Sequence, residues 1–422
     1  MHGLLTSRAR RRRRQATALL AAAAVVGACT STNTGGTPTT APSAAAATVT
    51  TTMPEDPAAL EPGRYPTTAA PPAGVAGTDT DGRLVEGRRM AGAVTGPWQI
   101  DPTLTRSGGA TAALITNPSE LGSVIYPTTT YTTPNLTTML VAFSSERWAA
   151  HPNTLTRLRN TLLRFPDDTT AAGVAAGLND GTLTMLVRTD SSDPIPIEPI
   201  RTVPVPTAPD ASAALLTFRE GTQTVHEAIL ITARGPFVLV HSARTATDPD
   251  AAVALVADTL ADQRARLDTF TPTPADQLVA LPRDPTGLAA RTVAATDPTS
   301  LASGTFDAHG ALHLQADPMA AGAAFTDAGV DVVSAALTTV YQSSDPAAAA
   351  TLAGQLGDNA AAEAAGVPGL PDSHCGSSVG AGGLARYQCI ATFGRYVFTA
   401  SSRDLNTAHQ QVAAQYLMLR GS

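Results

Sequence analysis

Two distant stretches of this 422-residue chain repeat one another, which restricts the chain to a fold that can be built twice. At a constant offset of 159 residues, positions 235–238 match positions 394–397, and positions 242–244 match positions 401–403. In both copies a β-rich run precedes the first glycine of the match and an alanine-rich helical pattern follows. Each copy therefore predicts a hairpin followed by a helix.

A weaker echo lies upstream, where residues 167–180 resemble residues 345–358 in the spacing of two aspartates and two aliphatic residues. Both segments predict small-residue helices that pack closely on a sheet, with chance as the alternative explanation for so few matched positions. The strands are short and lack the βαβ rhythm of a doubly wound fold. The fold class predicted is α+β, with two related domains whose antiparallel sheets pack against helices.

The N-terminus has the order of an export signal that ends in a lipidation site. Six arginines at positions 8 and 10–14 precede an apolar run at 16–28, which is too short to span a bilayer permanently. Residues 26–29, Val-Gly-Ala-Cys, resemble the bacterial lipobox, in which cleavage precedes the cysteine and its thiol receives diacylglycerol. We expect residues 1–28 to be a lipoprotein signal peptide and Cys29 to carry lipid such as palmitate. An ordinary secretory signal and a retained anchor helix are the alternatives.

Lipid at Cys29 would tether the mature chain to the outer leaflet of a bacterial cytoplasmic membrane, facing away from the cytoplasm. All 28 basic residues are arginine, as expected of a GC-rich bacterial genome. Removing residues 1–28 takes away six arginines and no acidic residue, so the formal net charge moves from −7 to −13. Such an acidic chain does not suit nucleic acid or anionic headgroups, so the lipid is the expected membrane partner.

Composition divides the mature chain into a tether and two domains. Residues 29–58 are rich in Thr, Ser, Ala and Pro and predict a disordered tether. The rest is too long for one core, and the best internal boundary is the Thr-Pro-Thr-Pro stretch at 271–274. We expect an N-terminal α+β domain at 59–270 and a C-terminal α+β domain at 275–422.

Two cysteines remain once Cys29 is assigned to lipid. Cys375 and Cys389 in an oxidising compartment predict a disulfide, which closes a loop of about 15 residues and contributes about 3 kcal/mol. A metal site would need further ligands, and His374 is the only obvious neighbour. We therefore predict neither a metal nor a cofactor.

One motif raises an enzymatic alternative. Residues 376–380 fit the G-x-S-x-G pattern of serine hydrolases, with Ser378 as nucleophile and Asp404 and His409 downstream in the required order. A nucleophile elbow needs a strand before the serine and a helix after it, whereas Ser378 lies in Gly- and Ser-rich sequence inside the disulfide loop. Asp404 more simply caps the helix that follows it. Catalysis is therefore not expected.

Three other groups of residues have plain structural interpretations. His309 and His313, near Asp307 and Asp317, fall around an expected strand at 311–316, where residues four apart are about 13 Å apart and their side chains would be solvated. The glycine-rich residues 380–383 before Arg386 lack the strand and helix of a phosphate loop, and favour an ordinary loop. The large aromatic residues predict core anchors of the first domain: Trp98, Phe143, Trp148 and Phe165.

Proline alternates with β-branched residues over 194–206. Proline cannot donate to the ladder of a central strand, so this stretch predicts an extended edge or a connector. It is also a candidate surface for a partner, because a pre-extended apolar segment loses little entropy on binding.

Several motifs together resemble a family of uncharacterised two-domain lipoproteins from mycolic-acid-bearing actinobacteria. The matching segments are 63–67, 84–91, 96–98 with 101–102, and the run from Cys389 through 394–397 to 413–416. The hairpin–helix unit is also similar to the extracellular sensor domains of mycobacterial receptor kinases, at the level of fold. The resemblance implies no activity. We expect an extracytoplasmic binding or scaffold module whose ligand is an envelope protein, a lipid or a glycan.

Overall fold

In the computed structural model the described residues are 55–108, 111–126, 130, 133–150, 155–184, 194–296, 300, 303–357, 361–379 and 384–422. The predicted signal peptide, Cys29, most of the predicted tether and the glycine-rich residues 380–383 lie outside them.

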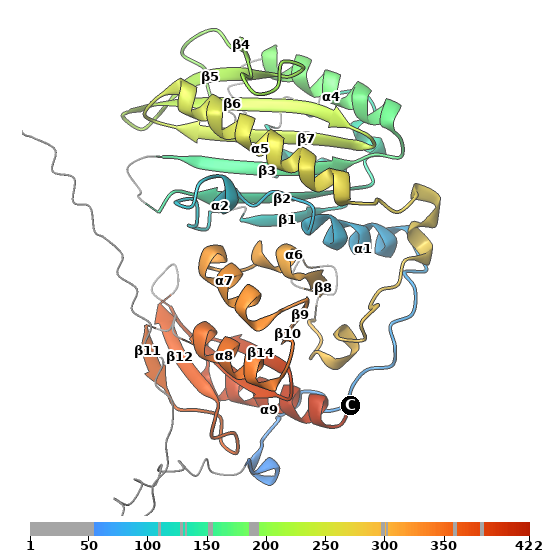
Figure 1. Cartoon of the computed structure of the whole chain (residues 1–422), viewed down its shortest axis with the longest axis vertical. Helices are drawn as coiled ribbons and strands as arrows, with labels where there is room; N and C mark the ends of the chain where they lie inside the picture. Colours follow the sequence, from blue (N-terminus) through green and yellow to red (C-terminus); the bar gives the residue numbers. More distant parts are fainter. Residues whose placement is uncertain are drawn as a thin grey trace, which may run out of the picture. The chain divides into compact units, whose positions relative to one another are not determined.

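The N-terminal half contains a seven-stranded antiparallel sheet in the order β1-β2-β3-β7-β6-β5-β4 (Figure 1). Its strands are β1 (Ala112–Ile115), β2 (Val141–Trp148), β3 (Arg157–Arg164), β4 (Arg201–Pro204), β5 (Ser212–Glu220), β6 (Gln223–Arg234) and β7 (Phe237–Thr245). The proline-rich stretch supplies β4 at the edge of this sheet, as its composition predicted, because an edge strand leaves one row of backbone groups unpaired.

The C-terminal half contains a second seven-stranded antiparallel sheet in the order β11-β12-β13-β14-β10-β9-β8. Its strands are β8 (Gly304–Asp307), β9 (Val332–Ala335), β10 (Thr338–Gln342), β11 (Ala362–Ala364), β12 (His374–Val379), β13 (Ala385–Phe393) and β14 (Tyr396–Ser402). Read from the other end, this is the order of the first sheet, strand for strand.

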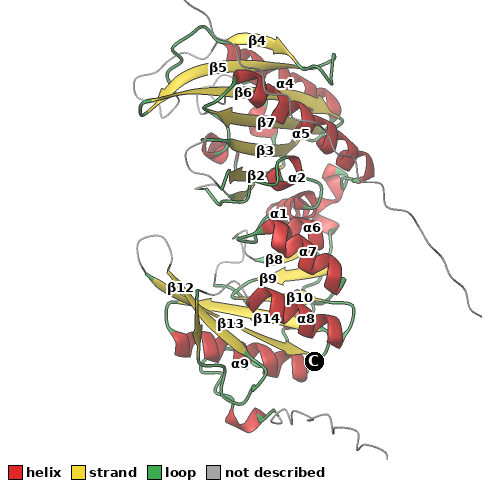
Figure 2. Ribbon diagram, turned by 60° about the vertical axis from the view of Figure 1, so that its left-hand side comes forward, coloured by secondary structure: helices red, strands yellow, loops and turns green. Residues whose placement is uncertain are grey.

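The two halves therefore share one topology, as the internal echo predicted. The matched glycines Gly235 and Gly394 both turn their hairpins at positive φ, +55° and +54°, a conformation that glycine adopts without strain. Each half also has one long helix on each face of its sheet (Figure 2). In the first half these are α4 (Asp168–Leu183) and α5 (Pro249–Thr269), and in the second half α8 (Pro346–Gly357) and α9 (Leu405–Arg420).

The weaker upstream echo corresponds to α4 and α8, which cover equivalent faces of the two sheets. Asp167 caps α4 by accepting from the Thr170 backbone N at 2.8 Å, and Asp345 accepts from Ala347 N and Ala348 N at 2.9 Å. The matched aspartates thus satisfy backbone donors that a helix N-terminus leaves free.

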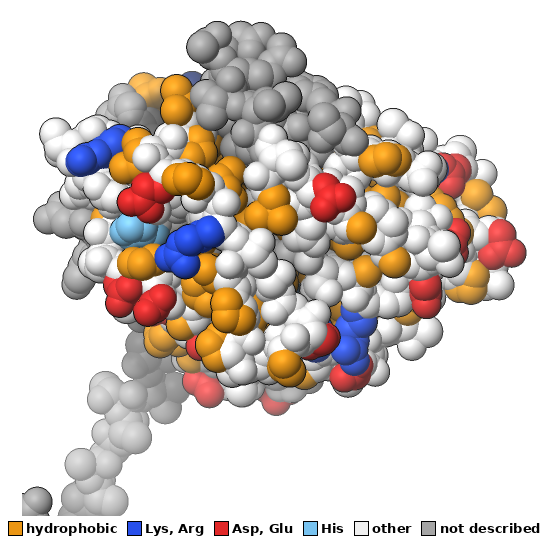
Figure 3. All heavy atoms as spheres, turned by 90° about the horizontal axis from the view of Figure 1, so that it is seen from above, with side chains coloured by type: hydrophobic (Ala, Val, Ile, Leu, Met, Phe, Trp, Pro, Cys, Tyr) orange, Lys and Arg blue, Asp and Glu red, His pale blue; other side chains and the backbone are white. Residues whose placement is uncertain are grey.

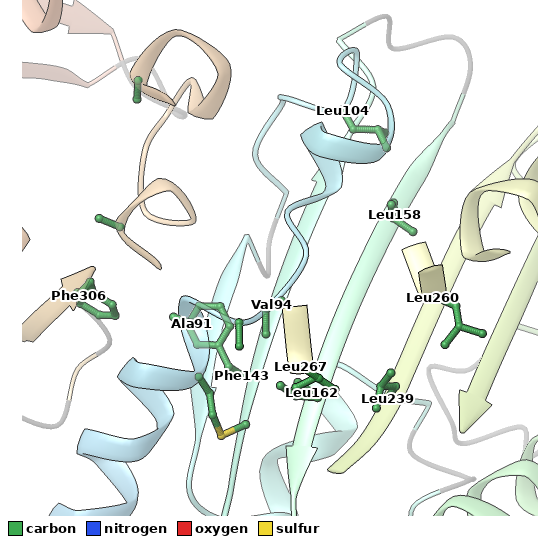
Figure 4. Packing of buried hydrophobic residues seen from close by; sticks show 14 of the residues in the cluster. Ala91, Val94, Leu104, Phe143, Leu158, Leu162, Leu239, Leu260, Leu267 and Phe306 are labelled. Atoms are coloured by element: carbon green, nitrogen blue, oxygen red, sulfur yellow. The ribbon is translucent and has the colours of Figure 1, made fainter. Parts of the chain in front are cut away.

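Helix α1 (Asp79–Ala91) joins the halves, because it packs on β1 and β2 and also on β8 and α6 (Ala308–Leu312). One apolar cluster runs through this junction and contains Ala91, Phe143 and Phe306 (Figure 4). The remaining helices of the described residues are α2 (Pro97–Ile100) and α7 (Pro318–Ala328), with short 3-10 turns at Pro57–Ala59, Pro118–Ser123, Leu136–Thr138, Ala275–Ala280 and Ala289–Arg291.

The segment predicted as a strand at 311–316 is instead the end of α6 and a turn. His313 is fully buried rather than solvated, with its Nδ1 2.8 Å from Ser145 Oγ and its Nε2 3.1 Å from the Ala91 carbonyl oxygen. Asp307 caps this short helix through Gly310 N. Five residues are too few for a helical period to be visible, which is why the sequence pattern misled.

The structure also differs from the predicted end of the tether at residue 58. Asp56 N donates to the Gly369 carbonyl at 3.0 Å, and Leu60 is buried against the second sheet together with Val367 and Leu370. Further on, Gln411 of α9 donates to Tyr65 Oη at 3.2 Å. Residues 55–72, which we call the strap, therefore pack on the C-terminal half and not on the N-terminal domain that 59–270 implied.

The predicted boundary at 271–274 is held by side chains of the N-terminal half. Thr273 N donates to Glu86 Oε1 at 3.0 Å, and Arg89 donates to the Thr271 carbonyl at 3.1 Å. Arg164 donates to the Thr273 carbonyl and pairs with Glu86. This stretch is packed rather than an open connector.

Trp98, Phe143 and Phe165 are buried core residues, as predicted, while Trp148 is partly buried. On the face shown in Figure 3, acidic and basic side chains are scattered among neutral ones. Among the described residues, no helix has the length and apolar character that a membrane span requires.

Candidate binding groove

The second sheet carries a groove of about 1000 Å³ on the face opposite α9. Alternation along the strands decides which side chains face it. Val340, Cys389 and Phe398 pack toward α9, so their neighbours in β10, β13 and β14 point into the groove. These neighbours form its floor: Thr339, Tyr341, Arg386, Gln388, Thr399 and Ser401.

The walls come from four other places. Helix α7 contributes a row of alanines, α8 contributes Gln355 and Leu356, and the α6–α7 turn contributes residues 314–317. Ser107 and Thr111 of the N-terminal half also line the groove. It is therefore shaped by segments that lie far apart in the sequence.

The lining mixes polar side chains with alanines and a few larger aliphatic residues, and it is nearly without charge. Arg386 is its one cation and Asp317 its one anion among the described residues, while hydroxyl and amide groups supply the other polar contacts. Gln355 Oε1 is buried and accepts no hydrogen bond within the described part of the chain. Burial raises the pKa of Tyr341, so its phenol stays protonated and remains a donor.

A buried arginine fixes the turn that borders the groove. Arg147 of β2 donates to the carbonyl oxygens of His313 at 3.1 Å and Gln315 at 2.8 Å, and to Ser107 Oγ at 3.3 Å. Its guanidinium also lies 5.6 Å from the Trp98 ring centroid. Burial lowers the pKa of Arg147 to about 10, which still leaves it charged at neutral pH. Arg147 thereby links the first sheet to the edge of the groove.

The corresponding face of the first sheet is filled. The offset of 159 residues places Glu227, Ile229, Val240 and Ser242 at the positions of Arg386, Gln388, Thr399 and Ser401. These four line a space of only about 20 Å³. The remaining volume is occupied by side chains from the β1–β2 connection and from β3: Val124, Ile125, Tyr126, Arg157 and Arg159.

An ionic cluster fills the polar part of that face. Glu227 Oε1 accepts from Arg157 Nη2 at 2.6 Å, and Glu227 Oε2 accepts from Arg244 Nε at 2.7 Å. Tyr126 Oη and Ser242 Oγ also donate to this carboxylate. Burial alone would raise the pKa of Glu227, but the two guanidinium groups bring it down to about 2. The carboxylate is thus ionised and fully satisfied.

The structure pairs Cys375 and Cys389 in a disulfide, as predicted, with the two residues directly opposite each other on β12 and β13. Their sulfur atoms and a ring nitrogen of His409 lie within 4.8 Å of one another on the α9 side of the sheet. With both sulfurs bonded to each other, this group has no thiolate to offer a metal.

The hydrolase alternative does not assemble among the described residues. Ser378 lies inside β12 rather than at a strand-to-helix turn, and alternation from Cys375 points it away from α9. His409 is on α9, where its Nε2 lies 2.9 Å from the Ala365 carbonyl oxygen. Asp404 caps the same helix by accepting from Thr407 N at 2.8 Å, and these bonds from Thr407 lower the pKa of Asp404.

Inspection of the sequence did not find the groove. Apart from Arg386, its floor residues carry hydroxyls and amides without a motif, and its walls depend on tertiary packing. One signal was available, because the internal echo aligns the acidic Glu227 with the basic Arg386. A change of charge at matched positions of a duplicated fold indicates that the two copies use this face differently.

Comparison with known proteins identifies a family without an assigned activity. Residues 73–283 match the model described as "Domain of unknown function (DUF7373) N-terminal", and residues 281–422 match its C-terminal counterpart. Together the matches span most of the chain, so the chain belongs to this family. A comparison with curated proteins finds no match.

Among solved structures, the chain is similar to the extracellular domain of PknH from Mycobacterium tuberculosis at 9% sequence identity. The similarity covers 43% of this chain and 96% of that one, with a TM-score of 0.29. A likeness at this level carries no inference about what the chain does.

Proposed function

We propose that this member of the DUF7373 family is an actinobacterial envelope lipoprotein, held at the outer leaflet of the cytoplasmic membrane by lipid on Cys29. In this proposal it acts as an extracytoplasmic binding module without catalysis, and its ligand occupies the groove of the second sheet. The leader at 1–28 supports the location, because its basic block, short apolar run and terminal cysteine are typical of lipoprotein signals.

One observation carries the binding role: the same face is filled in one copy of the fold and open in the other. In the first sheet the chain's own side chains leave about 20 Å³, whereas the second sheet leaves about 1000 Å³. Filling the second groove in the same way would bury more surface and stabilise the fold. A volume of this size is in the range of ligand sites in proteins.

A pair of cysteine variants tests the groove without knowledge of the ligand. Arg386→Cys places a thiol on the groove side of β13, and Ala385→Cys places one on the opposite side of the same strand. Both positions are exposed, so maleimide should label both in the purified mature protein. Adding a detergent extract of the cell envelope should slow labelling at Arg386→Cys and leave Ala385→Cys unchanged. Equal rates at both positions with the extract would contradict the proposal.

The anchor has a separate test. Cys29→Ala should release the protein from the membrane fraction without loss of its fold, because the proposal places the membrane attachment in the lipid alone. Unchanged fractionation would favour a retained N-terminal helix.

A further inference from the structure

We infer that the groove takes a neutral, polyhydroxylated ligand, such as a short oligosaccharide; this rests on the proposed binding function and names the ligand's chemistry. The hydrogen-bonding groups of the lining are the first reason. Ser401 offers a hydroxyl, and Gln355 and Gln388 offer amides, so each can both donate and accept. Sugar hydroxyls have the same double character, so they can pair with such groups in either direction.

The buried amide oxygen of Gln355 is the second reason. A buried acceptor without a partner costs free energy, and native structures leave few of them. Gln355 Oε1 has no partner among the described residues, although Gln355 lines the groove. A ligand that brings a hydroxyl donor would satisfy it.

Charge and polarity disfavour other ligands. Among the described residues the lining has one cation, Arg386, and one anion, Asp317. A phosphate or carboxylate ligand is usually held by several clustered cations. An acyl chain would bury the hydroxyls and amides of the floor without partners, at a cost for each group. The groove therefore fits an uncharged ligand that makes many hydrogen bonds.

The backbone of the floor disfavours an extended peptide. Peptides that bind sheets by strand addition need a free edge, where backbone groups are unpaired. The groove floor is made by β10, β14 and β13, which are paired on both sides within the sheet. A ligand here must be recognised by side chains, and the small alanines of α7 leave room for a sugar ring beside them.

Periodate treatment tests the ligand class, because periodate cleaves vicinal diols and so destroys most sugar rings. The probe is the envelope extract used with Arg386→Cys, either untreated or oxidised with periodate and then freed of reagent. We expect the untreated extract to slow labelling at least fivefold and the oxidised extract to have no effect. If protection survives oxidation, the ligand is not a glycan, although the binding module stands. If the untreated extract gives no protection, both proposals fail.

A second variant separates ligand contact from structure. In the Arg386→Cys background, Gln355→Leu keeps a side chain of similar volume and removes the unpartnered acceptor. A purely structural residue would leave protection unchanged, and removing an unsatisfied polar group should leave the melting temperature the same or higher. We expect the extract concentration that gives half protection to rise about tenfold. Unchanged protection in a folded Gln355→Leu variant would overturn the role of this residue in recognition.

Discussion

The two sheets of this protein have the same strand order and equivalent flanking helices. One face of the first sheet is filled by side chains, whereas the matching face of the second sheet is open. In the first sheet, Glu227 and its arginine partners close that face. In the second sheet, the matched Arg386 stands exposed at an open groove. Because the backbone frame is shared, the difference arises from a small number of side chains and from the connection between the first two strands. In this duplicated fold the face is filled in one half and open in the other.

The largest effect should come from the acid at the centre of the filled face. Glu227→Ala leaves Arg157 and Arg244 without their main partner in a buried site, so we expect the free energy of unfolding to fall by about 3–5 kcal/mol. Urea unfolding of the mature chain measures this. The matched control is Arg386→Ala, which should change stability by less than about 0.5 kcal/mol, as is usual for an exposed side chain. Equal losses for the two variants would mean that the faces do not differ as described.

The disulfide marks a second difference between the halves. Cys375 and Cys389 are opposite each other in the second sheet, and the offset places Cys389 at Leu230, which pairs with Ala213 in the first. We expect the Cys375→Ala, Cys389→Ala double variant to lose about 3 kcal/mol, because the unfolded chain is no longer restricted by the loop. Thermal unfolding in oxidising buffer gives this difference, and reductant should shift the wild-type curve but not that of the double variant. A double variant as stable as the oxidised wild type would remove this distinction between the sheets.

The smallest effect concerns acid sensitivity of the first sheet. His241 is buried, its ring nitrogens make no hydrogen bond among the described residues, and its counterpart in the second sheet is Ala400. Burial lowers the pKa of His241 to about 3, and Arg264 adds to this shift. Below pH 6.5 the unfolded state therefore binds a proton that the folded state does not. Stability falls from about pH 7 toward pH 3, by about 2 kcal/mol at pH 5 for this one group.

His241→Leu should remove that part of the pH dependence. We would compare the free energy of unfolding at pH 8 and pH 5 for wild type, for His241→Leu and for His374→Leu, whose side chain is exposed. Only His241→Leu should narrow the gap between the two pH values. An unchanged gap would show that the His241 side chain takes up a proton at pH 5 in the folded protein as readily as in the unfolded chain.

The sequence predicted the parts of this molecule that local rules govern. The hairpins at Gly235 and Gly394, the helices capped by Asp167 and Asp345, and the edge strand rich in proline all follow from a few neighbouring residues. The Cys375–Cys389 bridge followed from counting cysteines in the expected compartment.

What escaped prediction depends on contacts between distant segments. His313 is buried because it meets Ser145 and Ala91, neither of which is near it in the sequence. The groove requires Ser107, the α6–α7 turn and four strands of the second sheet at once. Its residues are ordinary polar ones and small or aliphatic apolar ones, so no spacing rule distinguishes them from the rest of the surface.

The strap has a mechanical consequence. Glu55 accepts from Tyr416 of α9, and Asp56 and Leu60 are attached to the same half (Figure 1). Any pulling force on the chain before Glu55 therefore enters the molecule through its C-terminal half, although that end of the chain precedes the N-terminal half in sequence. The force would reach the sheet that is cross-linked by Cys375 and Cys389 before it reached the uncross-linked one. For a chain held to a surface by its N-terminal end, the strap directs the load to the half that contains the Cys375–Cys389 disulfide.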